Sequence, residues 1–169
     1  WSPFEMVSVC MEITTTRDIA RQILRHRSFS FQEFSQRYAN PLDSLNRVVR
    51  EARLQDHQNR QNSIEVENES LQQNWAGQQD LVWLQAVKAY NWAIKMGIAK
   101  EQARAVLPEG LTESRLYVNG TLRSWIHYIE LREKNGTQKE HVEIARACAD
   151  ALTKIFPMGK EYLAPPKKA

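Results

Sequence analysis

The sequence RHRSFSFQEFSQRY occupies residues 25–38 and is the most informative stretch of the chain. It holds three Arg, one His, one Glu and three Ser within fourteen residues. Arginine carries a planar fork of donors that matches phosphate and carboxylate oxygens two at a time. Aromatic side chains suited to bordering a flat ring lie between the charges, at Phe29, Phe31, Phe34 and Tyr38. The stretch therefore predicts a site for a ligand with several anionic groups. The competing explanation is that cations are favourable at a helix C-terminus whatever their function.

Within this stretch, Arg25-His26-Arg27 is followed by seven residues and then by Ser35. This spacing resembles the signature of the flavin-dependent thymidylate synthases. Glu33 and Arg37 stand at the offsets that this family uses. Residues 121–132 are similar to the family's second binding segment, so the resemblance does not depend on the first motif alone.

The resemblance covers nearly all of the chain, from Trp1 to Phe156. It implies an α/β (α+β) fold in which long helices flank a central sheet. We therefore expect one domain over residues 1–169. The chain opens in a strand-like pattern without an initiator Met, so we also expect the N-terminal portion of this domain to lie upstream of Trp1.

The family resemblance also implies a reaction, the reductive methylation of deoxyuridylate (dUMP) to thymidylate (dTMP). Methylenetetrahydrofolate would supply the carbon, reduced FAD the hydride, and NADPH would reduce the flavin again. The implied assembly is a homotetramer in which subunits share each active site. These ligands all carry phosphates or carboxylates, which agrees with the arginine-rich stretch.

The nucleotide site follows from the same resemblance. Arg132 would be the catalytic residue, because a guanidinium against the uracil stabilises negative charge on the ring. Ser35 would lie near the uracil, but no base stands beside it in sequence, so it is not assigned as a nucleophile. The residues implied to bind dUMP are Arg21, Gln22, Arg25, Glu33, Ser35, Gln36, Arg37, Arg104 and Arg132.

The implied flavin site uses both motif segments and the start of the chain. Arg123 and His127 are four residues apart and share one face of a predicted helix. Thr121 stands where many family members carry Asn. The residues implied to bind FAD are Ser2, Arg25, His26, Arg27, Glu33, Thr121, Arg123 and His127. No metal site is expected, because the cysteines show no metal-ligand spacing.

Two other functions fit part of the sequence. A non-enzymatic module that binds RNA or phosphate would also use clustered arginines with interleaved aromatics. A flavoprotein reductase of another substrate would share the flavin contacts. The net charge of +3 is mild and no known RNA-binding motif is visible, which disfavours the first. Neither Cys10 nor Cys148 lies in a nucleophile motif, which disfavours synthases that attack uracil with a thiolate.

Length and composition set wider bounds. A chain of 169 residues can bury a real core as one domain. The first 87 residues hold nine Arg and no Lys, and the remainder holds five Arg and nine Lys. This asymmetry favours oriented anion recognition near the motif.

Cys10 and Cys148 are expected to be small buried residues in a reducing compartment. No apolar run approaches the roughly 20 residues that span a bilayer. We expect a cytoplasmic protein without membrane or nucleic-acid partners.

Periodic patterns predict the elements of the first forty residues. Alternation over residues 7–14 predicts a half-buried strand. A helix is expected over residues 16–26, capped by the side chain of Thr16. Residues 28–40 are expected to form an ordered loop. On the predicted helix, three stacked cations would repel one another unless an anionic ligand or Glu partners intervene, namely Arg17, Arg21 and Arg25.

The rest of the chain is predicted to be mainly helical. Residues 47–60 are polar and are expected to form a surface loop. Gly97 is expected to end a helix at the C′ position. The tryptophans are assigned to the core. Apolar periodicity predicts helices over residues 80–96, 100–107 and 122–132, and from Thr137 onward.

Overall fold

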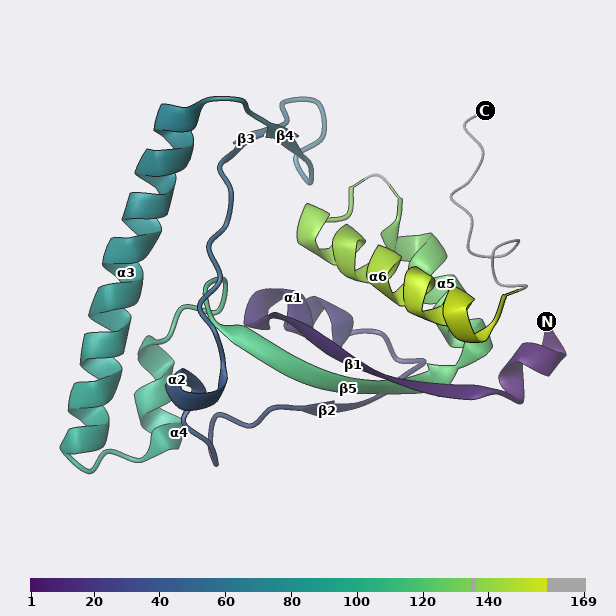
Figure 1. Cartoon of the computed structure of the whole chain (residues 1–169), viewed down its shortest axis with the longest axis horizontal. Coiled ribbons are helices and arrows are strands. Elements are labelled where there is room, and N and C mark those ends of the chain that lie inside the picture. The colour runs from purple at the N-terminus through teal and green to yellow at the C-terminus, as the bar shows by residue number, and fades with distance from the viewer. Residues whose placement is uncertain (135, 158–169) are drawn as a thin grey trace.

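A three-stranded antiparallel sheet lies at the centre of the chain, in the order β1-β5-β2 (Figure 1). The structure is a computed structural model that describes residues 1–134 and 136–157. The strands of the sheet are β1 (Ser8–Thr16), β2 (Ser30–Glu33) and β5 (Glu113–Thr121). Ser8 lies opposite Thr121, and Ser30 lies opposite Asn119, so β5 is paired on both edges. A separate two-stranded hairpin is formed by β3 (Arg53–Gln55) and β4 (Ser63–Glu65).

Helices α1, α5 and α6 cover one face of the sheet, and α3 stands apart on the far side of the hairpin (Figure 1). The mixture of helix and antiparallel sheet confirms the predicted fold class. The helices are η1 (Ser2–Glu5), α1 (Arg17–Ile23), α2 (Pro41–Ser44), α3 (Glu69–Lys95), α4 (Lys100–Ala103), η2 (Arg104–Val106), α5 (Leu122–Arg132) and α6 (Lys139–Ile155).

The main core lies between the sheet and these three helices. Ile13 is buried while its neighbour Thr14 is exposed, which confirms the half-buried strand predicted over residues 7–14. Cys148 is buried in this core as expected, but Cys10 is exposed, because alternation along β1 turns it to the outer face. Core side chains come from strands β1 and β5 and from the three helices, and they include Ile13, Ile19, Ile23, Leu116, Val118, Trp125, Ile126, Ile129, Ala149 and Leu152.

Helix α1 is shorter than predicted and is capped differently. It ends at Ile23, because the amide of His26 donates to the Ile23 carbonyl at 3.0 Å in a tighter turn. Thr16 occupies the N-cap position, but its hydroxyl donates to the Asp18 carboxylate at 2.6 Å and caps no backbone amide. The Arg17 amide instead donates to the carbonyl of Thr112 at 2.9 Å. Tertiary contacts thus supply the partners that the helix terminus needs.

The predicted loop over residues 28–40 contains strand β2. Phe31 lies opposite Val118 and packs against the main core together with Phe29. This edge pairing with β5 cannot be read from four residues of local sequence. The remainder of the segment is an ordered loop, in which the Ser35 carbonyl accepts from the amides of Tyr38 and Ala39 at 3.2 Å each.

Helix α3 begins at Glu69 rather than near Asp80, because its first turns are polar and show no apolar period. The Asn68 side chain accepts from the Leu71 amide at 2.9 Å and caps it. Gly97 follows its end with φ +77°, as predicted for a C′ glycine. Much of its apolar surface is exposed, and the residues concerned include Trp75, Leu81, Val82, Leu84 and Trp92. The assignment of tryptophans to the core is therefore right for Trp125 and wrong for Trp75 and Trp92.

The C-terminal helices follow the sequence pattern closely. Helix α5 has the predicted bounds, and α6 begins two residues after Thr137, at Lys139. Helix α4 and the turn η2 replace the single helix predicted over residues 100–107. Across residues 1–134 and 136–157, no helix combines the length and apolar character required to cross a bilayer.

Gly120 is where β2, β5 and α5 approach most closely. A Cβ at this position would lie 2.6 Å from Cε1 of Phe29, whose ring is held 4.6 Å from that of Trp125. We predict that Gly120→Ala lowers the free energy of unfolding by about 1–3 kcal/mol through overpacking.

The matched control is Gly77→Ala in α3, where an added Cβ meets nothing within 4 Å. This substitution should raise stability by up to about 1 kcal/mol through helix propensity. Urea denaturation of both variants tests the contrast, and equal stability of the two would refute the close packing of Phe29.

Candidate functional site

The loop after α1 lies along helix α5 and brings the two sequence motifs together. At one end, the His26 ring contacts the edge of Tyr128 with centroids 4.9 Å apart. At the other end, Phe29 packs on Trp125. Residues about a hundred positions apart thus form one surface, built from the first motif and from the helix that carries Arg123, His127 and Arg132.

Arg132 and His26 are joined by two hydrogen bonds. The Nε and Nη2 atoms of Arg132 lie 2.9 Å and 2.8 Å from Nε2 of His26. Because a guanidinium only donates, Nε2 must be the unprotonated nitrogen, and the ring is neutral with its proton on Nδ1. Burial lowers the pKa of His26 to about 4, and the positive charges of Arg132 and Arg25 act in the same direction. At neutral pH the pair therefore carries a single positive charge, on Arg132.

A second layer of polar side chains lies behind this pair. Nδ1 of His141 is 3.2 Å from Oε1 of Gln22, and its Nε2 is 3.1 Å from the Tyr128 hydroxyl. Nε2 of Gln22 donates to Oε1 of Gln138 at 2.9 Å. Of these residues only Gln22 was assigned from the sequence. His141 precedes the buried stripe Ala145, Ala149 and Leu152 by one helical turn, and this period was the available signal for its burial.

Glu33 and Arg21 are both engaged with other residues of the chain. Glu33 accepts a hydrogen bond from the Ser114 hydroxyl at 2.8 Å and lies 3.6 Å from Arg17. Arg21 donates through Nε to both oxygens of Glu109, at 2.8 Å and 2.7 Å. Glu109 also lies 3.8 Å from Arg17, so a glutamate relieves the repulsion between the stacked arginines of α1.

Arg37 and Arg104 meet at a different part of the chain, around Glu101. Arg37 forms an ion pair with the Glu101 carboxylate at 3.2 Å, and Nε of Arg104 donates to the Glu101 carbonyl at 3.3 Å. The amide of Arg37 lies 3.4 Å from the Ser35 hydroxyl oxygen. The intervening Gln36 is buried, and no hydrogen-bond partner is found for its Nε2 among the described residues.

The remaining flavin candidates lie at the N-terminus of α5. The Thr121 side chain accepts from the Ser124 amide at 3.2 Å and caps the helix. Arg123 donates to Glu5 at 2.9 Å, and the His127 ring lies 5.5 Å from that of Trp1. Ser2 opens the short helix η1 that carries Glu5.

Within one chain, the residues of the predicted site therefore lie in separate groups. His26, Arg132 and Gln22 belong to one, and Arg37 and Arg104 belong to another. Within residues 1–134 and 136–157, no hydrogen bond or ion pair joins the two groups. The structure brings together the two sequence segments that resemble the family, and it leaves Arg37 and Arg104, which were predicted to bind the nucleotide, elsewhere.

Comparison of the whole chain with known proteins decides its family. Residues 1–158 match the family described as thymidylate synthase complementing protein. The chain belongs to this family. It is 51% identical over 157 residues to the flavin-dependent thymidylate synthase of Synechocystis sp.. The matched region covers 93% of this chain and 71% of that protein. It is 50% identical, with the same coverage, to a "Probable flavin-dependent thymidylate synthase" of Paramecium bursaria Chlorella virus 1. A Mycobacterium tuberculosis flavin-dependent thymidylate synthase is 28% identical, over 93% of this chain and 62% of its own length.

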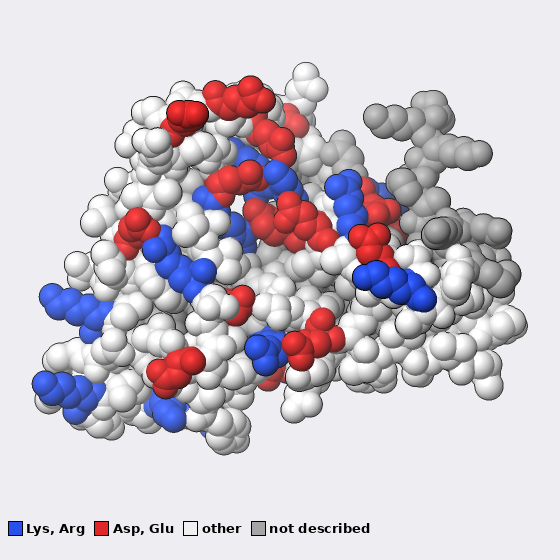
Figure 2. All heavy atoms as spheres, in the orientation of Figure 1, with Lys and Arg blue, Asp and Glu red and all other residues white. Residues whose placement is uncertain are grey.

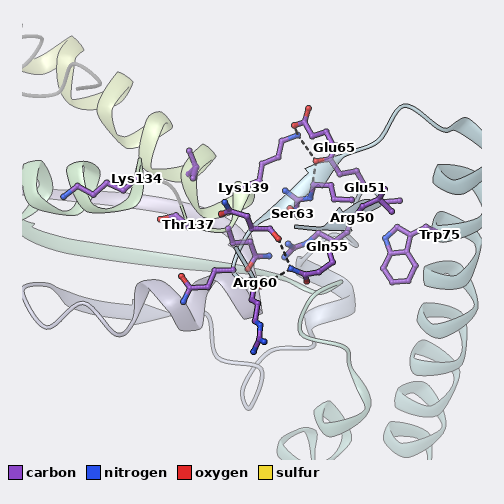
Figure 3. Close-up of a pocket in the computed structure, with 18 of the residues that line it drawn as sticks. Arg50, Glu51, Gln55, Arg60, Ser63, Glu65, Trp75, Lys134, Thr137 and Lys139 are labelled. Carbon is purple, nitrogen blue, oxygen red and sulfur yellow. Dashed lines mark hydrogen bonds and ion pairs between the residues drawn. The ribbon is translucent and has the colours of Figure 1, made fainter. Parts of the chain in front are cut away.

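This member of the thymidylate synthase complementing protein family also has a cavity of about 930 Å³ beside the site (Figure 3). The β3–β4 hairpin, the start of α3 and the turn between α5 and α6 enclose it. Basic and acidic side chains gather around a hollow on this face of the molecule (Figure 2). None of the residues assigned to dUMP or FAD lines the cavity, but Gln138, the partner of Gln22, does.

Ion pairs hold the wall of this cavity in place. Arg50 lies 2.8 Å from Asp18 of α1 and 3.0 Å from Glu140 of α6. Arg53 also pairs with Glu140. Lys139 contacts Glu51 at 2.7 Å (Figure 3). Residues 47–60 were expected to be a surface loop. Much of this segment is exposed, but it contains strand β3, and its arginines tie it to three helices, α1, α3 and α6, which the local sequence does not indicate.

The state of His26 gives a prediction on pH. Because its pKa is about 4 in the folded chain and about 6.5 when unfolded, the unfolded chain binds the extra proton between these values. Stability should therefore fall as the pH drops from about 6.5 to about 4. His141, whose pKa burial lowers to about 3, contributes to the same fall.

The substitution Arg132→Gln tests why the pKa of His26 is low, because it removes one of the two cations that act on His26. In an NMR titration, the pKa of His26 should rise in this variant and remain below 6.5, because burial is unchanged. A parent His26 that gains its proton near pH 6.5 would contradict the double hydrogen bond from Arg132.

Proposed function

We propose that the chain converts dUMP to dTMP with methylenetetrahydrofolate as carbon donor, FAD as flavin and NADPH as reductant. The observation that supports this most directly is the contact between His26 and Arg132. It joins the two sequence segments that the family signature requires. The relatives named as flavin-dependent thymidylate synthases align over 93% of the chain, so both segments fall within the matched region.

The charges around His26 fit a flavin dinucleotide. Arg25 and Arg27 are exposed, and among the described residues no carboxylate pairs with either of them. Unpaired guanidinium groups beside a neutral imidazole suit the phosphates of FAD. Arg123, Thr121 and His127, at the other end of α5, would hold the rest of the group. Bound flavin would supply the hydride; the residues of the chain bind and orient.

Arg132 is placed to act on the nucleotide ring. A guanidinium has five N–H donors, and His26 occupies two of them, which leaves about three for a ligand. The contact with His26 also fixes the plane of the fork. A fixed cation beside the uracil favours the ring's negatively charged form, and this is the catalytic role that we propose for Arg132.

We also propose that the active unit is a homotetramer with shared sites. The division of the nucleotide residues into two groups supports this, because a second chain can bring Arg37 and Arg104 toward the His26–Arg132 pair of the first. Helix α3 supports it independently. Its exposed Trp92, Leu84 and Leu81 have 61%, 63% and 59% of their surface accessible, and a partner chain would bury them. An isolated chain should then be inactive.

Arg37→Ala tests the nucleotide site. Losing a charge-assisted contact to phosphate should weaken dUMP binding by about 1.5–3 kcal/mol and leave flavin affinity nearly unchanged. The control is Arg115→Ala, which removes another exposed arginine paired with one glutamate, Glu12. Isothermal titration calorimetry with dUMP distinguishes the two variants. Parental affinity in Arg37→Ala would show that Arg37 only secures its loop to Glu101.

Arg132 separates chemistry from binding. If its charge acts mainly on the ionised ring, Arg132→Ala should lose turnover far more than dUMP affinity. NADPH should still reduce the flavin in this variant. Arg132→Lys keeps the charge without the planar fork and should remain strongly impaired.

The measurement follows flavin absorbance and dTMP formation separately in parent and variants. A parent protein that binds no flavin would refute the proposed function. A parent that reduces its flavin but forms no dTMP would indicate a reductase of another substrate. Parental dTMP formation by Arg132→Ala would remove the catalytic role from Arg132.

A further inference from the structure

His141 is the most completely buried charged or titratable side chain of the polar layer behind Arg132. Its relative exposure is 0%, although it carries two ring nitrogens that need partners. It projects from α6 between Gln22 of α1 and Tyr128 of α5, and both nitrogens reach a polar atom. A buried polar group in this position is costly unless its hydrogen bonds are made.

The hydrogen bonds determine which nitrogen of His141 carries the proton. Gln22 uses its amide nitrogen to donate to Gln138, so its Oε1 faces His141 as an acceptor. Nδ1 of His141 must therefore donate. In the neutral ring Nε2 is then an acceptor, and the Tyr128 hydroxyl donates to it at 3.1 Å. Every group in the chain Gln138–Gln22–His141–Tyr128 has a defined direction.

We propose that His141 is a positioning residue that orients the Gln22 amide toward the nucleotide and holds Tyr128 behind His26. This proposal rests on the proposed function, in which Gln22 contacts dUMP. The Gln22 oxygen is occupied by His141 and one of its amide hydrogens by Gln138. A single N–H remains, so Gln22 meets the nucleotide as a donor to one of its oxygens. Without the His141 proton, the amide is free to rotate and offer its oxygen instead.

Tyr128 links His141 to His26, and through His26 to Arg132. Its hydroxyl proton points to His141, and its ring packs against that of His26 in a T-shaped arrangement with centroids 4.9 Å apart. His26 in turn receives both hydrogen bonds from Arg132. His141 therefore acts on two site residues through two different nitrogens, and the two actions can be separated by substitution.

The experiment uses the full assembled protein and three substitutions of His141. In His141→Asn, the amide nitrogen can take the place of Nδ1 and keep the donor to Gln22. In His141→Gln, the longer side chain places its amide near Nε2 and keeps a partner for Tyr128 only. His141→Phe removes both. Leu152→Val is the control, because Leu152 is equally buried on the same helix and lies outside the polar layer.

We expect the dissociation constant for dUMP to rise about tenfold in His141→Phe and His141→Gln, the factor that one lost hydrogen bond can be worth. In His141→Asn it should return to within about threefold of the parent. Leu152→Val should lower the thermal midpoint and leave dUMP affinity unchanged. Equal affinity in His141→Phe and the parent, or equal effects of the Asn and Gln variants, would overturn the proposal.

A second measurement needs no nucleotide. Long-range ¹H–¹⁵N correlation of the histidine rings should show His141 protonated at Nδ1 and unprotonated at Nε2 at neutral pH. The opposite tautomer would overturn the assigned direction of the hydrogen bonds. A parent that binds no dUMP would be evident before any substitution, and it would overturn the proposed function together with the role of His141.

Discussion

The double hydrogen bond from Arg132 to one nitrogen of His26 constrains the whole site. It requires a neutral imidazole in the middle of three arginines, and partial burial against Tyr128 makes the neutral form the stable one. In return, the charge of Arg132 is held in a fixed plane without a carboxylate to neutralise it. A carboxylate partner would have fixed the fork equally well, but it would have cancelled the positive potential that an anionic ring needs. A histidine gives orientation without that loss.

The arginines of the chain also differ in whether a carboxylate pairs with them. Arg50, Arg53 and Arg21 each have a carboxylate partner, and they tie the hairpin and α1 to the rest of the chain. Arg25 and Arg27, beside the site, have none among the described residues. The arginines of this chain therefore have two distinct uses. Arg50 and Arg53 serve the fold through their ion pairs, whereas Arg25 and Arg27 leave their charge available to a ligand. Arg21, Arg37 and Arg123, which are also assigned to ligands, have carboxylate partners as well.

Helix α3 leaves large apolar side chains exposed in the single chain. Its buried side chains are few, and Tyr90 with three alanines and Leu107 forms a small second core around α4. Trp83 and Val87 are partly buried, and several large apolar side chains of the helix stay exposed, among them Trp75, Leu81, Val82, Leu84 and Trp92. The separation of Arg37 and Arg104 from the His26–Arg132 pair is the functional counterpart of that surface. The homotetramer that we propose would account for both, because another chain would complete the packing and the site.

The sequence by itself determined the mixed fold, the bounds of α5, the half-buried strand β1 and the family, because each depends on a local period or on a motif of fixed spacing. It also predicted Arg132 and His26 as site residues, but as separate members of two segments. Strand β2, the early start of α3 and the exposed position of Cys10 were not predicted, since β2 forms only by pairing with a distant strand and polar helical turns carry no apolar period. Only the tertiary structure decided that Arg132 donates to His26 and that His141 stands behind both Gln22 and Tyr128. Those contacts join α1, α5 and α6, and no local pattern in any one of these helices specifies which atoms of the other two it will meet.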